Sequence, residues 1–115
     1  MRDGTMYKQG DIILIPFPYT DLTGLKQRPA IIISGEKINK TEDRICCLIT
    51  SNNPIDGLKI RKEHFEKNDL PFQSWVKTHR IFTIHEKIIK KRLCSTTKSF
   101  QEKIKSSVEE CLAIE

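Results

Sequence analysis

Short runs rich in isoleucine constrain the fold of this chain more than any other feature of its sequence. Three such runs span residues 11–17, 29–34 and 44–50. Each has the length and the β-branched content of a strand, and turn-forming residues separate them. Residues 58–62 then alternate apolar and basic side chains, and residues 74–84 form a longer, imperfectly alternating stretch. Up to residue 84 the chain therefore predicts a mainly β fold, with the second run buried on both faces and the last strand bent.

Residues 18–27 combine Pro, Thr, Asp and Gly without periodicity, which predicts an exposed loop. Pro16 and Pro18 cannot donate hydrogen bonds to a neighbouring strand, so we expect the first strand to end there. A second turn is expected around Gly35 and Asn39.

A helix is predicted at the C-terminal end of the sequence. Ser99 and Glu102 fit the reciprocal pattern of a capping box. Apolar side chains then recur at spacings of three or four residues, which places them on one helical face that would pack on the sheet; they are Phe100, Ile104, Val108, Cys111 and Leu112. With 115 residues, the sequence predicts one domain over residues 1–115, a small bent antiparallel sheet or partly open barrel with a C-terminal helix.

The four cysteines do not predict a metal centre, because no pair has the Cys-x-x-Cys spacing. We expect no metal and no cofactor. Cys46 and Cys47 should point to opposite faces of their strand and serve as small apolar core residues. His64 and His85 are interpreted as surface residues.

Basic residues are concentrated in one part of the chain. The net charge is +5, and residues 57–92 alone carry ten Lys and Arg against four Asp and Glu. This distribution favours a polyanionic partner such as nucleic acid or an acidic protein, although a solvated basic face would give the same pattern. No apolar run has the length of a membrane span and no signal peptide is evident, so a cytoplasmic location is expected.

Two polar residues stand at the ends of buried strands, Arg28 before Pro29 and Thr50 after Leu48-Ile49. Pro29 restricts Arg28 to an extended backbone, so its guanidinium would be held in a defined orientation. A fixed fork of donors suits a phosphate and can stabilise the charge that develops during phosphoryl transfer. A surface ion pair for Arg28 and a turn role for Thr50 are the alternative.

The segment from Gly10 to Gly24, followed by Arg28-Pro29 and the isoleucine run, resembles the opening of the MazF/PemK (Kid) toxins of bacterial type II toxin–antitoxin systems. Thr50-Ser51-Asn52, residues 74–84 and the closing helix are similar to the rest of that family in order and spacing. The resemblance implies an SH3-like barrel and a homodimer that is silenced by a cognate antitoxin. It also implies metal-independent cleavage of single-stranded RNA at short motifs, which leaves a 2′,3′-cyclic phosphate and a 5′-hydroxyl.

The resemblance also implies roles for individual residues. Arg28 and Thr50 correspond to the catalytic pair, with Arg28 on the phosphorane and Thr50 orienting the phosphate. His79 takes the place of an acidic residue in some relatives, so it is either a general base or a hydrogen-bonded histidine on a half-buried strand. The residues expected to bind substrate are Tyr19, which could stack a base, and Lys26, Gln27, Ser51 and Lys77.

Three further interpretations stay open from the sequence. Trp75 would either stack a base or, as is more common for a Trp on a strand, lie in the core or in a dimer interface. Of these we favour the dimer interface. A gyrase-poisoning toxin of the related CcdB type would keep the same barrel, but the chain ends in Cys111-Leu112-Ala113-Ile114-Glu115 without the aromatic motif such toxins use. A family member that binds RNA or an antitoxin without catalysis is the third possibility.

Overall fold

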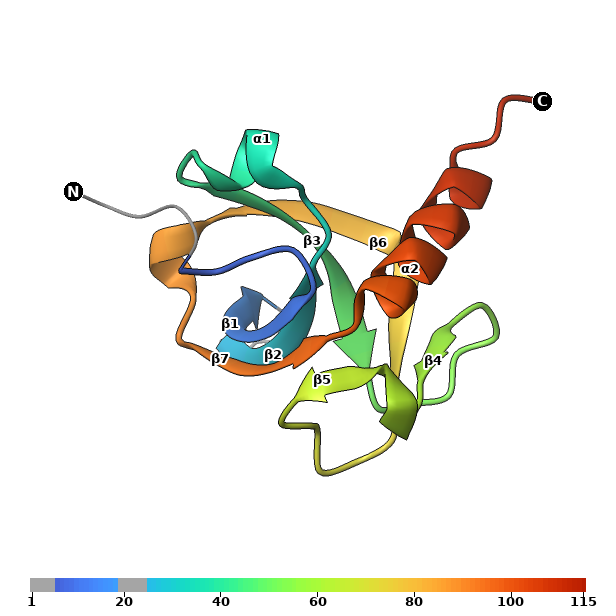
Figure 1. Cartoon of the computed structure of the whole chain (residues 1–115), viewed down its shortest axis with the longest axis horizontal. Helices are drawn as coiled ribbons and strands as arrows, with labels where there is room; N and C mark the ends of the chain where they lie inside the picture. Colours follow the sequence, from blue (N-terminus) through green and yellow to red (C-terminus); the bar gives the residue numbers. More distant parts are fainter. Residues whose placement is uncertain (1–5, 19–24) are drawn as a thin grey trace.

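A single curled antiparallel sheet forms the body of the protein. The computed structural model describes residues 6–18 and 25–115, and within them seven strands occur in the order β4-β6-β3-β2-β1-β7-β5. The strands are β1 (Asp11–Pro18), β2 (Leu25–Ile32), β3 (Asp43–Thr50), β4 (Leu58–Ile60), β5 (Phe65–Lys67), β6 (Ser74–His85) and β7 (Lys91–Thr96). The helices are α1 (Glu36–Asn39) and α2 (Lys98–Cys111), with 3-10 turns at Lys62–His64 and Glu86–Ile88. The strands close around one another and α2 crosses beside them (Figure 1), so the predicted bent barrel with a C-terminal helix is confirmed.

Apolar side chains form a cluster on each face of the sheet. Ile31 of β2 and Cys47 of β3 belong to the cluster that α2 covers through Phe100, and we call this the helix-side cluster. Ala30 and Cys46 belong to the cluster on the other face, which we call the opposite cluster. Neighbouring residues thus alternate between two cores, which explains why the isoleucine runs are almost continuously apolar. The expectation that Cys46 and Cys47 face opposite sides of one strand is confirmed.

The first strand does not end at its prolines. β1 continues to Pro18, because Pro16 and Pro18 pair with Gln27 and Leu25 of β2. On its other side β1 pairs with β7 only as far as Leu14. Beyond Leu14 none of the described strands pairs with that edge of β1, and a residue without an N–H is tolerated there. β2 consequently begins at Leu25, within the segment predicted as a loop.

Two strands and one short helix were not predicted from the sequence. β7 has exposed Lys91 and Arg92 in its first half and Ser and Thr in its second, so it lacks an apolar pattern. β5 is only three residues long. The turn expected around Gly35 and Asn39 contains the four-residue helix α1.

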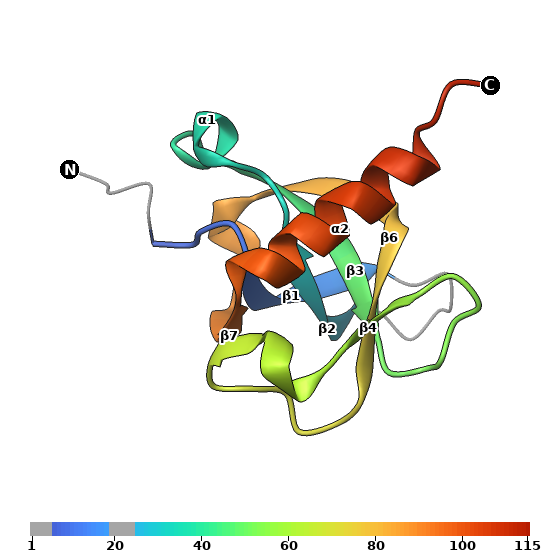
Figure 2. The same cartoon turned by 45° about the vertical axis from the view of Figure 1, so that its right-hand side comes forward.

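The N-cap of helix α2 lies two residues earlier than the sequence predicts. Thr97 is the N-cap, with Oγ1 accepting from the Phe100 backbone N–H at 3.2 Å, so the expected Ser99 cap is wrong. Phe100 and Ile104 are buried, but Leu112 is 66% exposed. The apolar stripe therefore leaves the sheet near its end, where the chain projects away from the barrel (Figure 2).

Two buried polar side chains tie distant segments to the barrel. Arg44 is fully buried and donates to the Tyr7 carbonyl at 3.0 Å and to Glu86 at 3.2 Å. His64 is also buried, stacked on Phe100 with ring centroids 4.3 Å apart, so its interpretation as a surface residue is wrong. Among the described residues, no helix is long and apolar enough to cross a membrane.

Candidate nucleic-acid cleavage site

The sheet brings Arg28 and Thr50 to adjacent strands at one end of the barrel. β2 and β3 pair as Ala30 with Leu48 and Ile31 with Cys47. Continuing this register by two residues sets Arg28 opposite Thr50. Directly opposite residues of an antiparallel pair have side chains on the same face, about 5 Å apart at Cβ. Both side chains are partly exposed, so the arrangement leaves them accessible to a ligand.

The Thr50 hydroxyl has a defined orientation. Its Oγ1 accepts a hydrogen bond from the Asn52 backbone N–H at 3.1 Å. One lone pair is thereby used, and the hydroxyl hydrogen is directed elsewhere. Thr50 is thus able to donate to an oxygen of a bound phosphate, next to the guanidinium of Arg28.

The strands around this pair carry positive charge without negative charge. β2, β4 and β6 contain no Asp or Glu, and the acidic residue of β3, Asp43, lies at its other end. Lys26 lies two residues before Arg28 and therefore on the same face of β2. Lys77 of β6 pairs with Leu48, which lies two residues before Thr50 on β3. The pair thus lies on a basic surface, which favours an anionic ligand.

His79 occupies an irregular part of β6. Cys47 pairs with Ile81 and Leu48 with Lys77, so His79 lies in a bulge between the two pairings, and its side chain is exposed. Thr50 pairs with Trp75, which precedes His79 by four residues on β6. Four residues of extended strand span at most about 13 Å, so His79 lies within that distance of Trp75. The bulge re-aims side chains next to the basic surface, as bulges often do near functional sites.

The remaining predicted substrate-binding residues lie around the same end of the barrel or outside the described residues. Lys26 and Gln27 are exposed at the start of β2, and Ser51 is exposed directly after Thr50. Lys77 is half-buried on β6. Tyr19 lies outside the residues that the structure describes.

The sequence did not show that Trp75 and Lys59 lie together in this row. Trp75 is opposite Thr50 on β6, and Lys59 of β4 is opposite Trp75. The alternating pattern of residues 58–62 indicated a strand with one wet face, but only the long-range pairing of β4 with β6 shows where that face lies. Trp75 is 9% exposed, which fits core packing better than a freely accessible stacking platform.

The basic zone of residues 57–92 does not form one surface. Lys59 and Lys77 lie on the neighbouring strands β4 and β6, beside the Arg28–Thr50 pair. Arg92 lies on β7, three strands beyond β3 in the sheet order, where it contacts Asp11 at 3.4 Å. The first group alone is positioned to act with Arg28.

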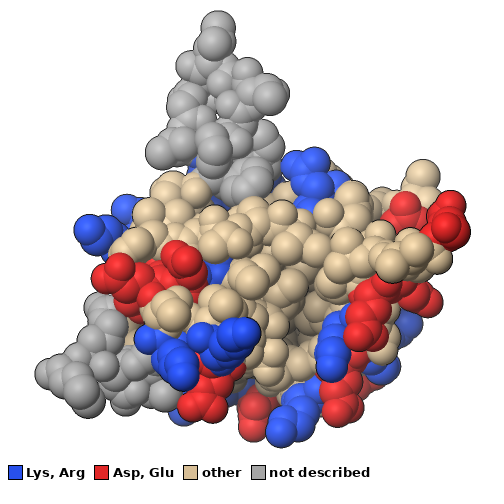
Figure 3. Space-filling model, turned by 90° about the horizontal axis from the view of Figure 1, so that it is seen from above, with Lys and Arg blue, Asp and Glu red and all other residues tan. Residues whose placement is uncertain are grey.

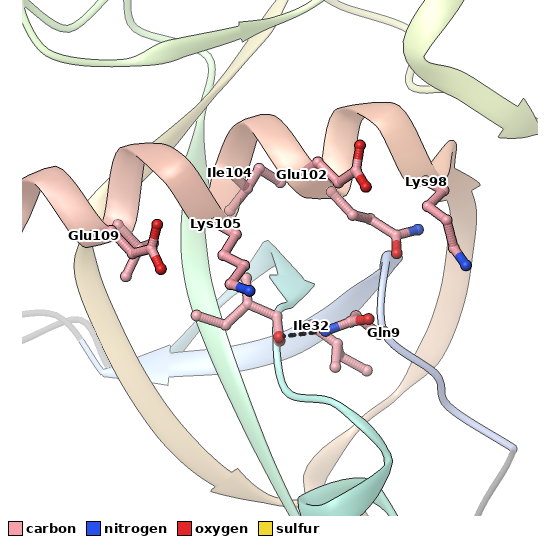
Figure 4. A pocket seen from close by; sticks show the side chains of 10 residues that line it. Gln9, Ile32, Lys98, Glu102, Ile104, Lys105 and Glu109 are labelled. Carbon is pink, nitrogen blue, oxygen red and sulfur yellow. Dashed lines mark hydrogen bonds between the residues drawn. The ribbon is translucent and has the colours of Figure 1, made fainter.

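A cavity of about 360 Å³ lies elsewhere in the molecule. It is lined by α2 residues such as Lys98, Ile104 and Lys105 and by Gln9, Ile32 and Ile33 (Figure 4). Ile32 is the last residue of β2, whereas the Arg28–Pro29 step lies in the middle of that strand. This cavity is therefore separate from the Arg28–Thr50 pair, and Gln9 spans part of it through a 2.9 Å hydrogen bond to the Ile33 carbonyl.

The chain is thus a small β barrel that carries an arginine and a threonine on neighbouring strands. The family described as PemK-like, MazF-like toxin of type II toxin-antitoxin system matches residues 8–112. The chain belongs to this family. No curated protein matches the sequence.

Solved structures with the same fold are distant in sequence. A mycobacterial endoribonuclease in complex with its cognate antitoxin is 17% identical, with a TM-score of 0.73 over 94% of this chain and 96% of that one. MazF from a MazE–MazF crystal of Deinococcus radiodurans is 15% identical, with a TM-score of 0.72 over 94% and 97% of the two chains. The Mycobacterium tuberculosis toxin MazF-mt6 is 13% identical, with a TM-score of 0.71 over 91% and 98%. These similarities establish the fold over nearly the full length of each chain.

Proposed function

We propose that this toxin is a metal-independent endoribonuclease that cleaves single-stranded RNA at short sequence motifs. The observation that carries the proposal is the register of β2 and β3: the strands pair as far as Ala30–Leu48, and continuing that register by two residues would set Arg28 opposite Thr50. Membership of the PemK-like, MazF-like family supports it, as does the similarity in fold to solved endoribonucleases. A CcdB-like attack on gyrase has no comparable support, because the matched family is the PemK-like one.

In the proposed reaction the 2′-oxygen of a nucleotide attacks the adjacent phosphorus. The bond from phosphorus to the 5′-oxygen of the next nucleotide breaks, leaving a 2′,3′-cyclic phosphate and a 5′-hydroxyl. Arg28 donates to the non-bridging oxygens as their negative charge grows, while Thr50 holds the phosphate through its hydroxyl. A base takes the 2′-hydroxyl proton, and the leaving 5′-oxygen receives a proton, for which Arg28 is our candidate donor.

Substrate contacts are assigned to the basic surface and the loops beside it. Lys26, Lys77 and Ser51 would bind the backbone, and Gln27 and Tyr19 would contact bases that are splayed from the single strand. A cognate antitoxin would cover the same basic surface with an acidic segment; structures with the same fold include complexes with an antitoxin, which supports such a partner. The cytoplasm is the expected compartment, since RNA and antitoxin meet there.

The experiment is cleavage of a long single-stranded RNA by the purified protein, with chelator present and with the ends mapped. We expect Arg28→Ala to lower kcat by about 100- to 1000-fold, as loss of one preorganised transition-state donor does. Thr50→Val removes the hydroxyl and should lower kcat at least about tenfold. Thr50→Ser restores the hydroxyl and should recover much of the rate.

Lys37→Ala on α1 serves as the control, because its exposed charge lies on an element outside the proposed site. Equal cleavage by the wild type and Arg28→Ala would contradict the proposal. RNA binding by a wild type that produces no cyclic-phosphate ends would instead favour the non-catalytic alternative.

The same assay run across pH tests the hypothesis that His79 is the general base. In that case the acidic limb of the kcat profile comes from protonation of the base, and His79→Ala removes this limb. An unchanged profile in His79→Ala would leave the histidine in a structural role only.

A further inference from the structure

We infer that Lys59 is an additional RNA-binding residue, held in place by Trp75, that contacts a phosphate next to the one that is cleaved. The inference rests on the proposed function and names a residue to which that function assigns no role. It concerns binding of the substrate strand, not the bond-breaking step.

The pairing of three strands places Lys59 in line with the Arg28–Thr50 pair. Thr50 of β3 is opposite Trp75 of β6, and Trp75 is opposite Lys59 of β4. Opposed residues share a face, so all of these side chains lie on the face that carries the proposed site. With neighbouring strands about 4.8 Å apart, Lys59 lies roughly 10 Å across the sheet from Thr50.

The Lys59 ammonium lies over the Trp75 ring, with Nζ 5.9 Å from the ring centroid. A cation above an aromatic face is attracted by the ring electrons, and the attraction restricts an otherwise flexible side chain. The lysine side chain is half-buried, unlike the exposed Arg61 and Lys62 that follow on the same segment. The cation is therefore partly preorganised before any ligand binds.

The loop after Thr50 supports this arrangement from the other side. A Cβ at Gly57 would collide with Pro54 and come within 3.0 Å of the Trp75 Cβ, so the loop backbone packs directly on the tryptophan. Asp56 of this loop is exposed and is the acidic residue nearest in sequence to Lys59. Among the described contacts no ion pair joins the two, and the ammonium is placed by the ring.

The distance decides the role of the lysine. At roughly two strand spacings from Thr50, Lys59 is too far away to act on the phosphate held by Arg28 and Thr50. An extended single strand that crosses β3 and β6 would bring an adjacent phosphate to the ammonium. A contact of this kind strengthens binding through release of counterions and leaves the chemical step unaltered.

The test measures binding of a single-stranded RNA oligonucleotide that contains a mapped cleavage site with a 2′-deoxy nucleotide at the attacking position. We expect Lys59→Gln to raise Kd about fivefold at 0.1 M salt. Near 1 M salt the Kd of the variant should approach that of the wild type. The slope of log Kd against log salt should therefore be smaller by about 0.7 in the variant. With cleavable RNA, KM should rise by a similar factor while kcat stays within about twofold. Lys37→Gln on α1 is the charge-matched control and should leave the slope unchanged.

Trp75 is tested as a positioning residue by two substitutions. Trp75→Phe keeps an aromatic face and should retain most of the affinity, whereas Trp75→Leu should raise Kd by about twofold to fivefold. In a Lys59→Gln background, Trp75→Leu should add nothing to Kd. Circular dichroism and thermal unfolding of each variant separate these effects from loss of the fold.

An unchanged salt slope in folded Lys59→Gln would overturn the inference, and additive effects of the two substitutions would overturn the positioning role of Trp75. The outcome is independent of the proposed reaction. Cleavage that depends on Arg28 with no effect of Lys59→Gln defeats the inference alone. Salt-dependent binding through Lys59 without cleavage defeats the proposed function alone.

Discussion

His64 is a titratable side chain enclosed by the packing of α2 against the barrel. Its ring stacks on Phe100, and its Nδ1 accepts a hydrogen bond from the Arg61 backbone N–H at 3.0 Å. Burial and then the positive charge of Lys103 lower the pKa of His64 from its ordinary value of 6.5, against an opposing effect of Glu63. The folded protein therefore requires a neutral imidazole at this position.

Acid should consequently weaken the fold through this residue. Between pH 6.5 and the lower pKa of the folded state, the unfolded chain binds the additional proton, so the free energy of unfolding falls as the pH falls. Above pH 6.5 the neutral His64 ring makes its full contribution to the free energy of unfolding. Urea unfolding at pH 7.5 and pH 5.5 checks this prediction. We expect His64→Gln to be less stable at pH 7.5 but to lose less stability on acidification than the wild type does; an equal loss in both proteins would be inconsistent with it.

The residues of the site differ in how far the sequence identifies them. Arg28 and Thr50 were recognisable because each stands directly at the end of a buried apolar run, next to Pro29 or to a polar turn. Lys59 and the buried His64 were not, because their environments come from segments distant in sequence. The environment of Lys59 depends on the register of β4 with β6, and that of His64 depends on the position of Phe100. Both are set by the whole barrel, so neither produces a local sequence pattern.

Capping decides where α2 begins. Thr97 Oγ1 accepts from the Phe100 backbone N–H, and the Thr97 backbone N–H donates to the His64 carbonyl at 2.9 Å. The cap thus joins the helix to the 3-10 turn at Lys62–His64. Ser99, which the capping-box pattern favours, is an exposed residue of the first helical turn.

Substitutions at these two positions should have different effects. Thr97→Ala leaves the Phe100 N–H without its side-chain acceptor and should lower the free energy of unfolding by about 0.5–2 kcal/mol. Ser99→Ala is the matched control and should change it by less than about 0.5 kcal/mol. Chemical denaturation measures both. A larger effect at Ser99 than at Thr97 would restore the cap expected from the sequence.

Elements with an apolar pattern were predictable and those without one were not. The isoleucine runs specify β1, β2 and β3 because each buries both faces. β7 has no such pattern, since Lys91 and Arg92 are exposed while its backbone bonds with β1 and β5 supply the pairing. The extension of β1 through Pro18 depended on which edge of that strand is unpaired, a property that belongs to the assembled sheet.

At the scale of the molecule, one face has few charges. α1, the C-terminal end of α2 and part of β6 lie in the upper half of Figure 1, and the view from above shows an uncharged band with charged side chains around its margins (Figure 3). Ile81 of β6 is 38% exposed. Uncharged patches of this kind commonly mark protein interfaces, and a second copy of the chain is the partner that the family resemblance implies.

The expected assembly is a homodimer with twice the 13.4 kDa mass of one chain. Light scattering coupled to size-exclusion chromatography measures this mass directly. Ile81→Glu places a charge on β6 and should shift the equilibrium toward the monomer at a given concentration. Ile55→Glu, at a fully exposed position of the loop before β4, should leave the mass unchanged. A wild type that remains monomeric at high concentration would contradict the prediction.

The position of the Arg28–Thr50 pair also bears on how the protein can be switched off. The two residues are borne by β2 and β3, whose paired residues Ala30 and Leu48 are buried in the centre of the sheet. Displacing one strand relative to the other would require opening the barrel, so we expect an inhibitor to act by covering the pair and not by separating the two strands. Activity then returns without refolding, and the dissociation rate of the inhibitor governs how quickly this happens.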